Sequence, residues 1–501
     1  MSAPVFSRIP GFSRLRPGMA GRLSATVGAV VVAVGMMMLP AAATAAIYRE
    51  WHDAGWILAA AAISTAVGFI AWRWAGTRGQ ITAKEAFATA GLIYFVIMVF
   101  GSLPYLLTGS LADPTDALFE AASGFTTTGS TTLADPGVLS HGMLMWRAMT
   151  QWMGGMGIIV LSIAILPWLG VGGVQLARAE TTGPEPSRLT PRFRETAKRL
   201  WLLYAVLTGF AILLLALGDM GMFDAIAHGF TTAASGGFGT RADSLAGFSA
   251  YTQWVVIVLM FLTGVSFVLH YRALRDPMEY LRSVEFRTYG MLVLAAAGIV
   301  VAGLWAAGGA AGDAIRNGVF SAVALITTTG FFTTDWGQWV EWLQILVVGM
   351  MFFGAMAGST SGGVKTFRFG ILLRSSGADL KRMLYPDAVL TPRYEGRPID
   401  PEIVHSVQSF FLFYMMAFVG GTFLLALAEA VFGAGTDLVT SASAVASALG
   451  NFGPALGDVG PAGTYAVLTA PAKWLLSFLM ILGRLEIFPV LLLFTRHLWR
   501  R

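Results

Sequence analysis

Four short stretches of the chain combine glycine with threonine, serine or asparagine, and each lies between two apolar segments. The first reads SGFTTTGST at residues 123–131, and a close copy, ALITTTGFFTTDW, occupies residues 324–336. Two weaker copies are TTAASGGFGTRAD at 231–243 and ASALGNFGPALGD at 446–458. When the four stretches are aligned, equivalent positions are held by Gly129, Gly237, Gly330 and Gly453. One such stretch could be an ordinary turn, but four at the same place in a repeat indicate a shared task.

Loops of this kind could bind an alkali cation through backbone oxygens. A short helix that ends inside a membrane leaves its last carbonyls unpaired, and its C-terminal end carries a partial negative charge. Glycine then permits a positive φ, so that preceding carbonyls can face one axis and replace the hydration shell of an ion. The predicted ligands, with the four aligned glycines just above them, are the carbonyls of Thr127, Thr128, Ser235, Gly236, Thr328, Thr329, Asn451 and Phe452.

The composition places these loops in a membrane protein. The chain has 501 residues, of which 56% are hydrophobic and only 12% are charged, whereas an ordinary globular domain carries about 25% charged residues. Its apolar segments reach the length of about 20 residues that crosses a bilayer core. The absence of cysteine excludes disulfide and thiolate chemistry. The net charge of +5 does not indicate nucleic-acid binding, because the basic residues are scattered over short loops.

Two kinds of apolar segment alternate along the chain. The long ones predict spans at 24–48, 54–75, 82–108, 143–168, 196–218, 250–271, 287–308, 337–355, 402–432 and 464–495. Shorter ones, too short to cross a bilayer and too apolar for ordinary loops, lie at 114–125, 221–234, 312–327 and 437–449. Their lengths suggest re-entrant helices.

The basic residues predict the orientation of these spans. Most Lys and Arg lie in the N-terminal leader, in 171–200, 272–287 and 364–400, and at the C-terminus. All of these fall on one side when the ten predicted spans are threaded in order, and the positive-inside rule makes that side cytoplasmic. Both termini are then cytoplasmic, and every short segment enters from outside. The segment 24–48 also resembles a secretory signal, but we expect a retained span.

The expected unit is a span, a short pore helix, a glycine loop and a second span, repeated four times. We therefore predict an all-α polytopic membrane protein in which two N-terminal spans precede the four repeats. The predicted divisions are 1–80 for the leader and the two extra spans, then 81–178, 179–283, 284–400 and 401–501 for the four repeats.

The stretch GAMAGSTSGG at 354–363 interrupts what would be the inner span of the third repeat. A continuous helix there would cost about 1 kcal/mol per glycine relative to alanine, so we expect an unwound loop that lies under the filter, blocks the ion path and can move. The alternative is close helix packing of the small-xxx-small type through Gly354 and Gly358. The residues predicted to gate, with Lys365 at the cytoplasmic mouth, are Gly354, Gly358, Ser359, Thr360, Ser361, Gly362 and Gly363.

Arg484 lies near the middle of the last predicted span. An arginine in mid-bilayer costs about 2.5 to 3.5 kcal/mol and is a functional candidate. Glu486 is two residues away and does not share its helix face. We expect Arg484 to face the pore below the filter, where it opposes cations or braces the gate. The alternative is a structural pair with another helix.

Three further stretches carry a resemblance to a known family. They are WRAMTQWMGGMGIIVLSIAILP at 146–167, AGSTSGGVKTFR at 357–368 and KWLLSFLMILGRLEIF at 473–488. With the four loops, they resemble the Trk/Ktr/HKT superfamily of potassium transporters, and specifically its bacterial TrkH type, over residues 25–500.

This resemblance implies four span–pore-helix–span repeats around a pseudo-four-fold pore axis. It implies K⁺ as the transported ion, no cofactor in this chain, no enzymatic activity and a place in the bacterial inner membrane. It further implies a homodimer, an intramembrane gating loop at 354–363, and a cytosolic TrkA-type ring of nucleotide-binding subunits as partner. Repeats two and four read SGGFG and NFGPA, so the filter is expected to be asymmetric.

Two other functions can be compared with this one. A proton- or sodium-coupled potassium symporter predicts carboxylates near the ion site, and these are nearly absent from the predicted spans, apart from Glu486 and from Glu120 on a short helix. An intramembrane hydrolase using Ser359 or Ser361 is disfavoured, because no Gly-x-Ser-Gly sequence is present. Flux measured with and without a pH gradient separates the symporter from the pore.

Overall fold

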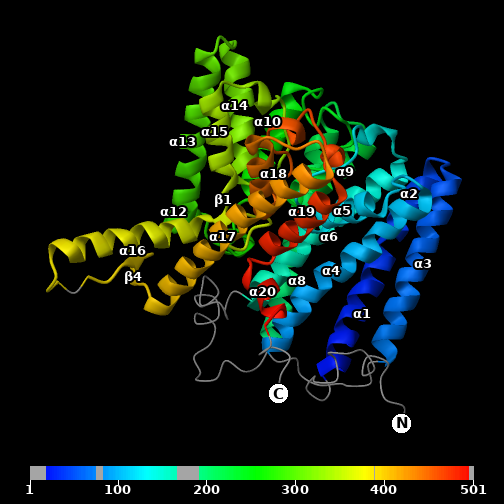
Figure 1. Ribbon diagram of the computed structural model, residues 1–501, viewed down its shortest axis with the longest axis horizontal. Helices are drawn as coiled ribbons and strands as arrows, with labels where there is room; N and C mark the ends of the chain where they lie inside the picture. The colour runs from blue at the N-terminus through cyan, green and yellow to red at the C-terminus, as the bar shows by residue number, and fades with distance from the viewer. Residues whose placement is uncertain (1–18, 75–82, 166–190, 389, 496–501) are drawn as a thin grey trace. The chain divides into compact units, whose positions relative to one another are not determined.

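The computed structural model describes residues 19–74, 83–165, 191–388 and 390–495 (Figure 1). Within these residues nearly all regular structure is helical, with two pairs of two-residue strands. The chain forms two compact units. The first draws on Met1–Ala122, Leu139–Trp146 and Leu485–Arg501, and the second on Ser123–Val138 and Arg147–Arg484.

Six helical segments of the described chain are long and apolar enough to cross a membrane, and a bent pair, α10 (Ala250–Thr263) with α11 (Phe267–Ala273), makes a seventh. Ten spans were expected. Two of the other three expected spans contain helix ends: α15 (Glu341–Met351) stops before the loop 354–363, and the last expected span divides into α19 (Ala470–Arg484) and α20 (Phe488–Leu493). The third, at 143–168, extends beyond the described residues. The six segments are Met19–Ile47, Trp51–Trp74, Ala88–Thr108, Glu195–Ala216, Val284–Ala306 and Pro401–Phe432.

The first unit is a bundle whose helices pack through small residues and one ion pair. Gly28 and Gly68 lie against each other, and a Cβ on either would come within 3.0 Å of the other's carbonyl oxygen. The Arg22 guanidinium binds both oxygens of the buried Glu85 carboxylate. Its helices are α1 (Met19–Met37), α2 (Leu39–Ile47), α3 (Trp51–Trp74), α4 (Ala83–Thr108) and α20.

The predicted short helices are present with nearly the expected bounds, which confirms that part of the fold prediction. Each has 12 to 16 residues, too few to cross a bilayer. They are α5 (Pro114–Phe125), α9 (Met222–Ala233), α14 (Ala311–Ile326) and α18 (Leu438–Gly450). The longer helices around them are α6 (His141–Ile165), α8 (Pro191–Ala216), α13 (Val284–Ala306) and α17 (Pro401–Phe432).

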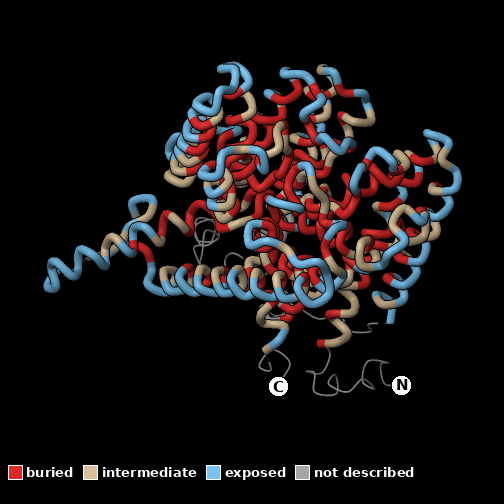
Figure 2. Tube along the Cα trace, turned by 45° about the horizontal axis from the view of Figure 1, so that its top comes forward, coloured by how far each residue is buried: buried red, intermediate tan, exposed pale blue. Residues whose placement is uncertain are grey.

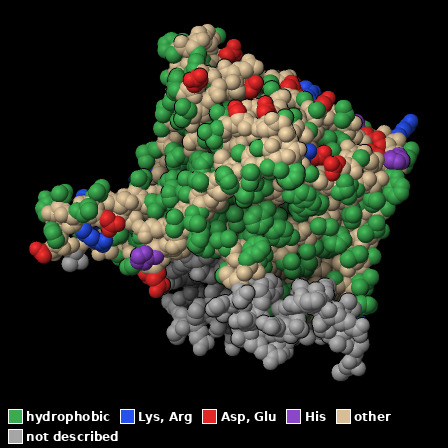
Figure 3. All heavy atoms as spheres, viewed as in Figure 1, with side chains coloured by type: hydrophobic (Ala, Val, Ile, Leu, Met, Phe, Trp, Pro, Cys, Tyr) green, Lys and Arg blue, Asp and Glu red, His purple; other side chains and the backbone are tan. Residues whose placement is uncertain are grey.

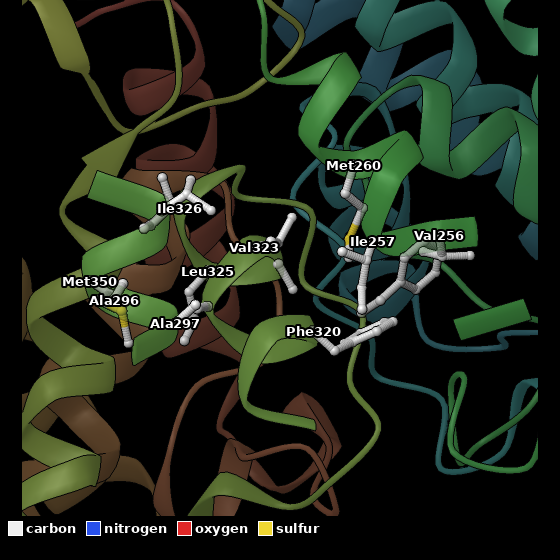
Figure 4. Close-up of a cluster of buried hydrophobic side chains, with 14 of the residues drawn as sticks. Val256, Ile257, Met260, Ala296, Ala297, Phe320, Val323, Leu325, Ile326 and Met350 are labelled. Carbon is white, nitrogen blue, oxygen red and sulfur yellow. The ribbon is translucent and has the colours of Figure 1, made fainter. Parts of the chain in front are cut away.

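The apolar core of the second unit forms around one of these short helices. Phe320 and Val323 of α14 are buried against Val256 and Met260 of α10 (Figure 4), and Ala296 of α13 belongs to the same cluster. Helix α14 is thus enclosed by longer helices, so that its C-terminal end is held in place.

A broken region follows α15. Strands β1 (Phe353–Gly354) and β2 (Val364–Lys365) pair in parallel and close the loop 354–363 at its base. Helix α16 (Thr366–Leu384) then begins, and its last residues are exposed (Figures 1 and 2). A hairpin of β3 (Arg393–Tyr394) and β4 (Arg397–Pro398) precedes α17.

The surface agrees with a membrane setting. Figure 3 shows hydrophobic side chains over much of the central part of the visible face, with charged side chains mainly toward its edges. Large apolar side chains are also exposed on the long helices, including Leu294 of α13, which is 73% exposed, and Phe423 of α17, which is 66% exposed. Such exposed apolar area on spanning helices is what contact with lipid requires.

Candidate functional site

The four glycine loops share one backbone conformation. Each aligned glycine has a positive φ: 90° at Gly129, 79° at Gly237, 77° at Gly330 and 115° at Gly453. Two residues earlier, each loop has a non-glycine residue in the left-handed region, which few such residues adopt. These residues are Thr127, Ser235, Thr328 and Asn451, with φ of 53°, 53°, 54° and 52°.

The same hydrogen bonds end each short helix. In the first loop the Thr127 amide donates to Gly124 O and the Thr128 amide to Ser123 O. The bonds at Ser235 and Gly236, at Thr328 and Thr329, and at Asn451 and Phe452 repeat these spacings. They satisfy two of the helix's last carbonyls and turn the chain sharply. The sequence repeat therefore corresponds to a repeat in backbone geometry.

The loops contact one another in a closed cycle. A Cβ on each aligned glycine would lie within 3.0 Å of a carbonyl oxygen of the next loop, closer than Cβ atoms come in proteins. The pairs are Gly129 with Gly236 O, Gly237 with Thr329 O, Gly330 with Phe452 O, and Gly453 with Thr128 O. Loop one therefore meets loop two, two meets three, three meets four, and four meets one. The arrangement brings one predicted ligand carbonyl of each loop against the aligned glycine of a neighbouring loop.

Two polar residues of α6, which the sequence analysis missed, support the second loop. The Gln151 amide donates from Nε2 to Gly236 O at 2.6 Å, and its Oε1 accepts from the Phe238 amide at 3.1 Å. Arg147 donates to Gly239 O at 3.2 Å, and its guanidinium lies 4.0 Å from the centre of the Phe238 ring. A glutamine and an arginine inside an apolar span were the signal that could have revealed them.

The intramembrane loop 354–363 docks where α10 and α11 separate. The axes of these two helices differ by 96°. The Met356 amide donates to Gly264 O at 3.0 Å, and the Phe267 amide donates to Gly358 O at 3.0 Å. The break in the helix exposes backbone groups that the loop then satisfies. The loop is therefore joined to repeat two as well as to its own repeat.

The tip of this loop reaches the base of the glycine loops. Thr360 Oγ1 lies 2.8 Å from Ser235 Oγ, and the Gly362 amide donates to Thr328 Oγ1 at 2.7 Å. A Cβ on Gly362 would collide with the carbonyl of Gly450 at the end of α18. All of these groups are buried or half-buried. The loop thus lies directly against the second, third and fourth glycine loops.

Two buried cations hold the loop. Lys365 Nζ donates to Ser361 O at 2.6 Å. Arg484 donates to Thr360 O at 2.8 Å and to Gly154 O at 3.1 Å. Arg484 is the last residue of α19 and is 2% exposed. Both positive charges therefore lie beside the loop, close to the base of the site.

A carboxylate that the sequence analysis missed also binds the loop. Glu285, at the start of α13, accepts a hydrogen bond from the Ala357 amide at 2.7 Å through Oε1. The buried Glu429 of α17 serves a different purpose, because it accepts from the amide and hydroxyl of Thr469. Across the described parts of the chain, no group of three or more His, Cys, Asp or Glu side chains could hold a metal ion.

Comparison with known proteins agrees with this geometry. Residues 57–500 match the family TrkH, described as a cation transport protein. The chain is 39% identical over 433 residues to the Trk system potassium uptake protein TrkH of Halomonas elongata, which covers 85% of this chain and 88% of that protein. It is 37% identical over 480 residues to the Salmonella typhimurium protein of that name, covering 94% and 97%. The crystal structure of the potassium transporter TrkH from Vibrio parahaemolyticus matches with a TM-score of 0.87 at 32% identity, covering 96% and 99%.

The apolar helices and these relatives, all named as transport or uptake proteins, place the chain in the class of multi-pass membrane transport proteins, which are not enzymes. The chain belongs to the TrkH family of cation transport proteins. The resemblance carried by residues 146–167, 357–368 and 473–488 is thereby confirmed.

Proposed function

We propose that this protein takes up potassium across the bacterial inner membrane through a filter of backbone carbonyls. The closed cycle of contacts among the four glycine loops supports the proposal, because equivalent loops from four repeats meet in one ring. Rings of backbone carbonyl oxygens can replace the hydration shell of K⁺. The relatives named above are themselves described as potassium uptake proteins.

The filter residues are the twelve predicted ones: residues 127–129, 235–237, 328–330 and 451–453. The short helices direct their C-terminal ends, with partial negative charge, toward these loops. The left-handed residues and the glycines allow the turns that align the carbonyls. Irregular backbone at membrane depth is tolerated where protein or water surrounds it, and a pore lining meets that condition.

The gate in this proposal is the loop 354–363, with Lys365 and Arg484. Its tip contacts the base of the filter through Thr360 and Gly362, which is where a closed gate must lie. The two cations at Lys365 and Arg484 oppose the passage of another cation. Separate hydrogen bonds to Ser235, Thr328 and Arg484 hold its tip, so the tip can leave when the groups that hold it move.

Control comes from outside this chain in the proposal, from a TrkA-type ring of cytosolic nucleotide-binding subunits. Strand β2 runs directly into α16, so force on α16 would reach the loop through Lys365. Residues 379–388 are exposed and offer a surface for that partner. The protein further acts as a homodimer, and exposed apolar side chains at the end of α16 support a covered interface there. They are Leu380, Met383 and Leu384.

The experiment is ion flux through the purified protein in liposomes, measured alone and with the cytosolic ring plus ATP or ADP. We expect K⁺ and Rb⁺ flux that the nucleotide changes. Nucleotide that never alters flux through the intact complex contradicts the gating part. Flux that depends on an imposed pH or sodium gradient would instead support coupled symport, and exclusion of K⁺ would contradict the filter.

A further inference from the structure

One filter carbonyl is bound by three hydroxyl groups. Gly453 O accepts from Ser447 Oγ at 2.7 Å, from Ser130 Oγ at 2.9 Å and from the Tyr465 hydroxyl at 2.9 Å. Ser447 Oγ also accepts from the Gly453 amide at 3.0 Å. All three hydroxyl residues are at most 2% exposed, so water does not compete for these bonds.

This arrangement engages the Gly453 carbonyl oxygen in bonds to the protein's own hydroxyl groups. A backbone carbonyl oxygen has two lone pairs, and three donors fill them. Ser447 lies on the short helix α18, behind the loop that ends in Gly453. The positive hydrogens of the three hydroxyls also surround the oxygen and repel a cation. Gly453 O is therefore a poor ion ligand in this conformation.

The other three loops lack this arrangement in the described chain. The positions equivalent to Ser130 in the other three repeats hold Phe238, Phe331 and Pro454, which carry no hydroxyl. In repeats two and three the positions equivalent to Ser447 hold Thr231, whose hydroxyl donates to Ala227 O at 3.2 Å, and Ala324. The residue equivalent to Ser447 in the first repeat is Ser123, six residues before its glycine. Ser123 is buried, and its hydroxyl has no hydrogen-bond partner among the described residues. The same side chain thus engages the glycine carbonyl in repeat four and leaves it alone in repeat one.

We propose that the outermost cation site of the filter is built from three glycine carbonyls, and that Ser130, Ser447 and Tyr465 withhold the fourth. This inference rests on the proposed function of the filter. The three hydroxyl residues are positioning residues, because they act on the ion through Gly453. They are also the side chains that make the filter asymmetric at its outer end.

A site with three carbonyl ligands binds an ion less tightly than one with four. Conduction needs binding that is favourable enough to admit the ion and weak enough to release it. A weak outer site collects K⁺ from outside and passes it inward without trapping it. Restoring the fourth ligand should therefore raise K⁺ affinity and slow transport at saturating K⁺.

The test uses the full-length protein in detergent and in liposomes, with KCl or NaCl titrated against choline chloride. Ion-dependent thermal stabilisation gives apparent affinities, and ⁸⁶Rb⁺ flux gives transport. The variants are Ser447→Ala, Tyr465→Phe and both together, with Ser123→Ala as the matched control. Each single variant loses one buried hydroxyl, but only Ser447→Ala and Tyr465→Phe remove a donor to the Gly453 carbonyl. In the double variant Ser130 is the one of the three that still donates to it.

We expect the double variant to bind K⁺ about three- to tenfold more tightly, the effect of freeing an oxygen from bonds of ordinary strength. Na⁺ affinity should change less, and Ser123→Ala should match the wild type. A merely structural role predicts the opposite, weaker K⁺ binding with lost selectivity. If the double variant does not fold, each single variant carries the test with a smaller shift in the same direction.

The outcomes separate this inference from the proposed function. A wild type that neither binds nor conducts K⁺ overturns the proposed function. A wild type that binds K⁺, with Ser447→Ala and Tyr465→Phe unchanged or weaker, overturns only the assignment of a withheld carbonyl. A rise in K⁺ affinity confined to these variants supports it.

Discussion

The glycine loops and the loop 354–363 are both irregular backbone, yet they are held in different ways. Each glycine loop is fixed by bonds to its own short helix and by close backbone contact with its neighbours, where not even a Cβ fits. The loop 354–363 is also closely packed at Gly362, but separate hydrogen bonds attach it to several elements, among them Glu285, Thr328 and Arg484.

The difference explains how one protein can select ions and also close. A filter needs fixed distances, which tight backbone packing provides. A gate needs two arrangements of similar free energy, and a few separate hydrogen bonds, each contributing about 1 kcal/mol, can be exchanged together. Substitutions in the first region should therefore alter which ion passes, and substitutions in the second should alter how much passes.

The largest effect is expected from Gly129→Ser. At a φ of 90° a side chain is strained, and its Cβ would collide with Gly236 O. Strain of about 1 to 3 kcal/mol would move the carbonyls and reduce the preference for K⁺ over Na⁺ by about tenfold or more. The measurement is the permeability ratio in liposomes. Gly209→Ser is the control, since a Cβ at Gly209 meets open space. An unchanged ratio means that the filter alignment is wrong.

The second prediction tests the loop as a separate unit. Shortening 356–362 removes Thr360 and Gly362, which contact Ser235 and Thr328. Losing even these two hydrogen bonds of ordinary strength shifts a closed-to-open equilibrium by about tenfold or more. We therefore expect K⁺ flux without the cytosolic partner, with the K⁺ to Na⁺ ratio retained.

The control for this variant is the intact protein without partner, measured in the same liposomes. A shortened protein that stays closed alone would show that the loop is not the barrier. A shortened protein that conducts but has lost ion preference would show that the loop is part of the filter, and the contrast between the two regions would fail.

Local features of both regions could be predicted from the sequence. Gly129 and its three equivalents could be recognised as turn positions, because only glycine adopts such turns freely. The short helices could be predicted from the lengths of their apolar segments. The glycine-rich composition of 354–363 was enough to predict an interrupted span. In each case the physical cause lies within a few consecutive residues.

Contacts between distant residues could not be predicted in this way. Gln151 and Gly236, or Gly264 and Met356, are brought together only by the packing of whole repeats. One local feature of the sequence does indicate a break after α19, which ends at Arg484. Pro489 lies in the first turn of α20, and proline is favoured at a helix start.

The third prediction concerns Arg484→Ala. The substitution removes two charged hydrogen bonds to the carbonyls of Thr360 and Gly154 and a positive charge beside the gate. We expect several-fold higher K⁺ flux or an altered voltage dependence, with the ion ratio unchanged. Folding is checked by size-exclusion chromatography and thermal unfolding. A purified variant with normal flux would reduce Arg484 to a packing residue.

The smallest effect is expected at Glu285, which accepts a hydrogen bond from the Ala357 amide of the loop. Glu285→Ala removes an acceptor for that amide, and a hydrogen bond contributes about 0.5 to 1.5 kcal/mol, so basal K⁺ flux should rise by about two- to tenfold. Glu285→Gln is the matched variant, because its amide oxygen can still accept the bond, and it should stay near the wild type. Both variants should keep the wild-type K⁺ to Na⁺ ratio, since the bond that Glu285 makes is to the loop and not to one of the twelve filter residues.

Equal flux in the two variants would mean that the charge of Glu285, and not its hydrogen bond, holds the loop. A changed ion ratio in either would mean that loop and filter are one rigid body, because the loop could then not move without altering selectivity.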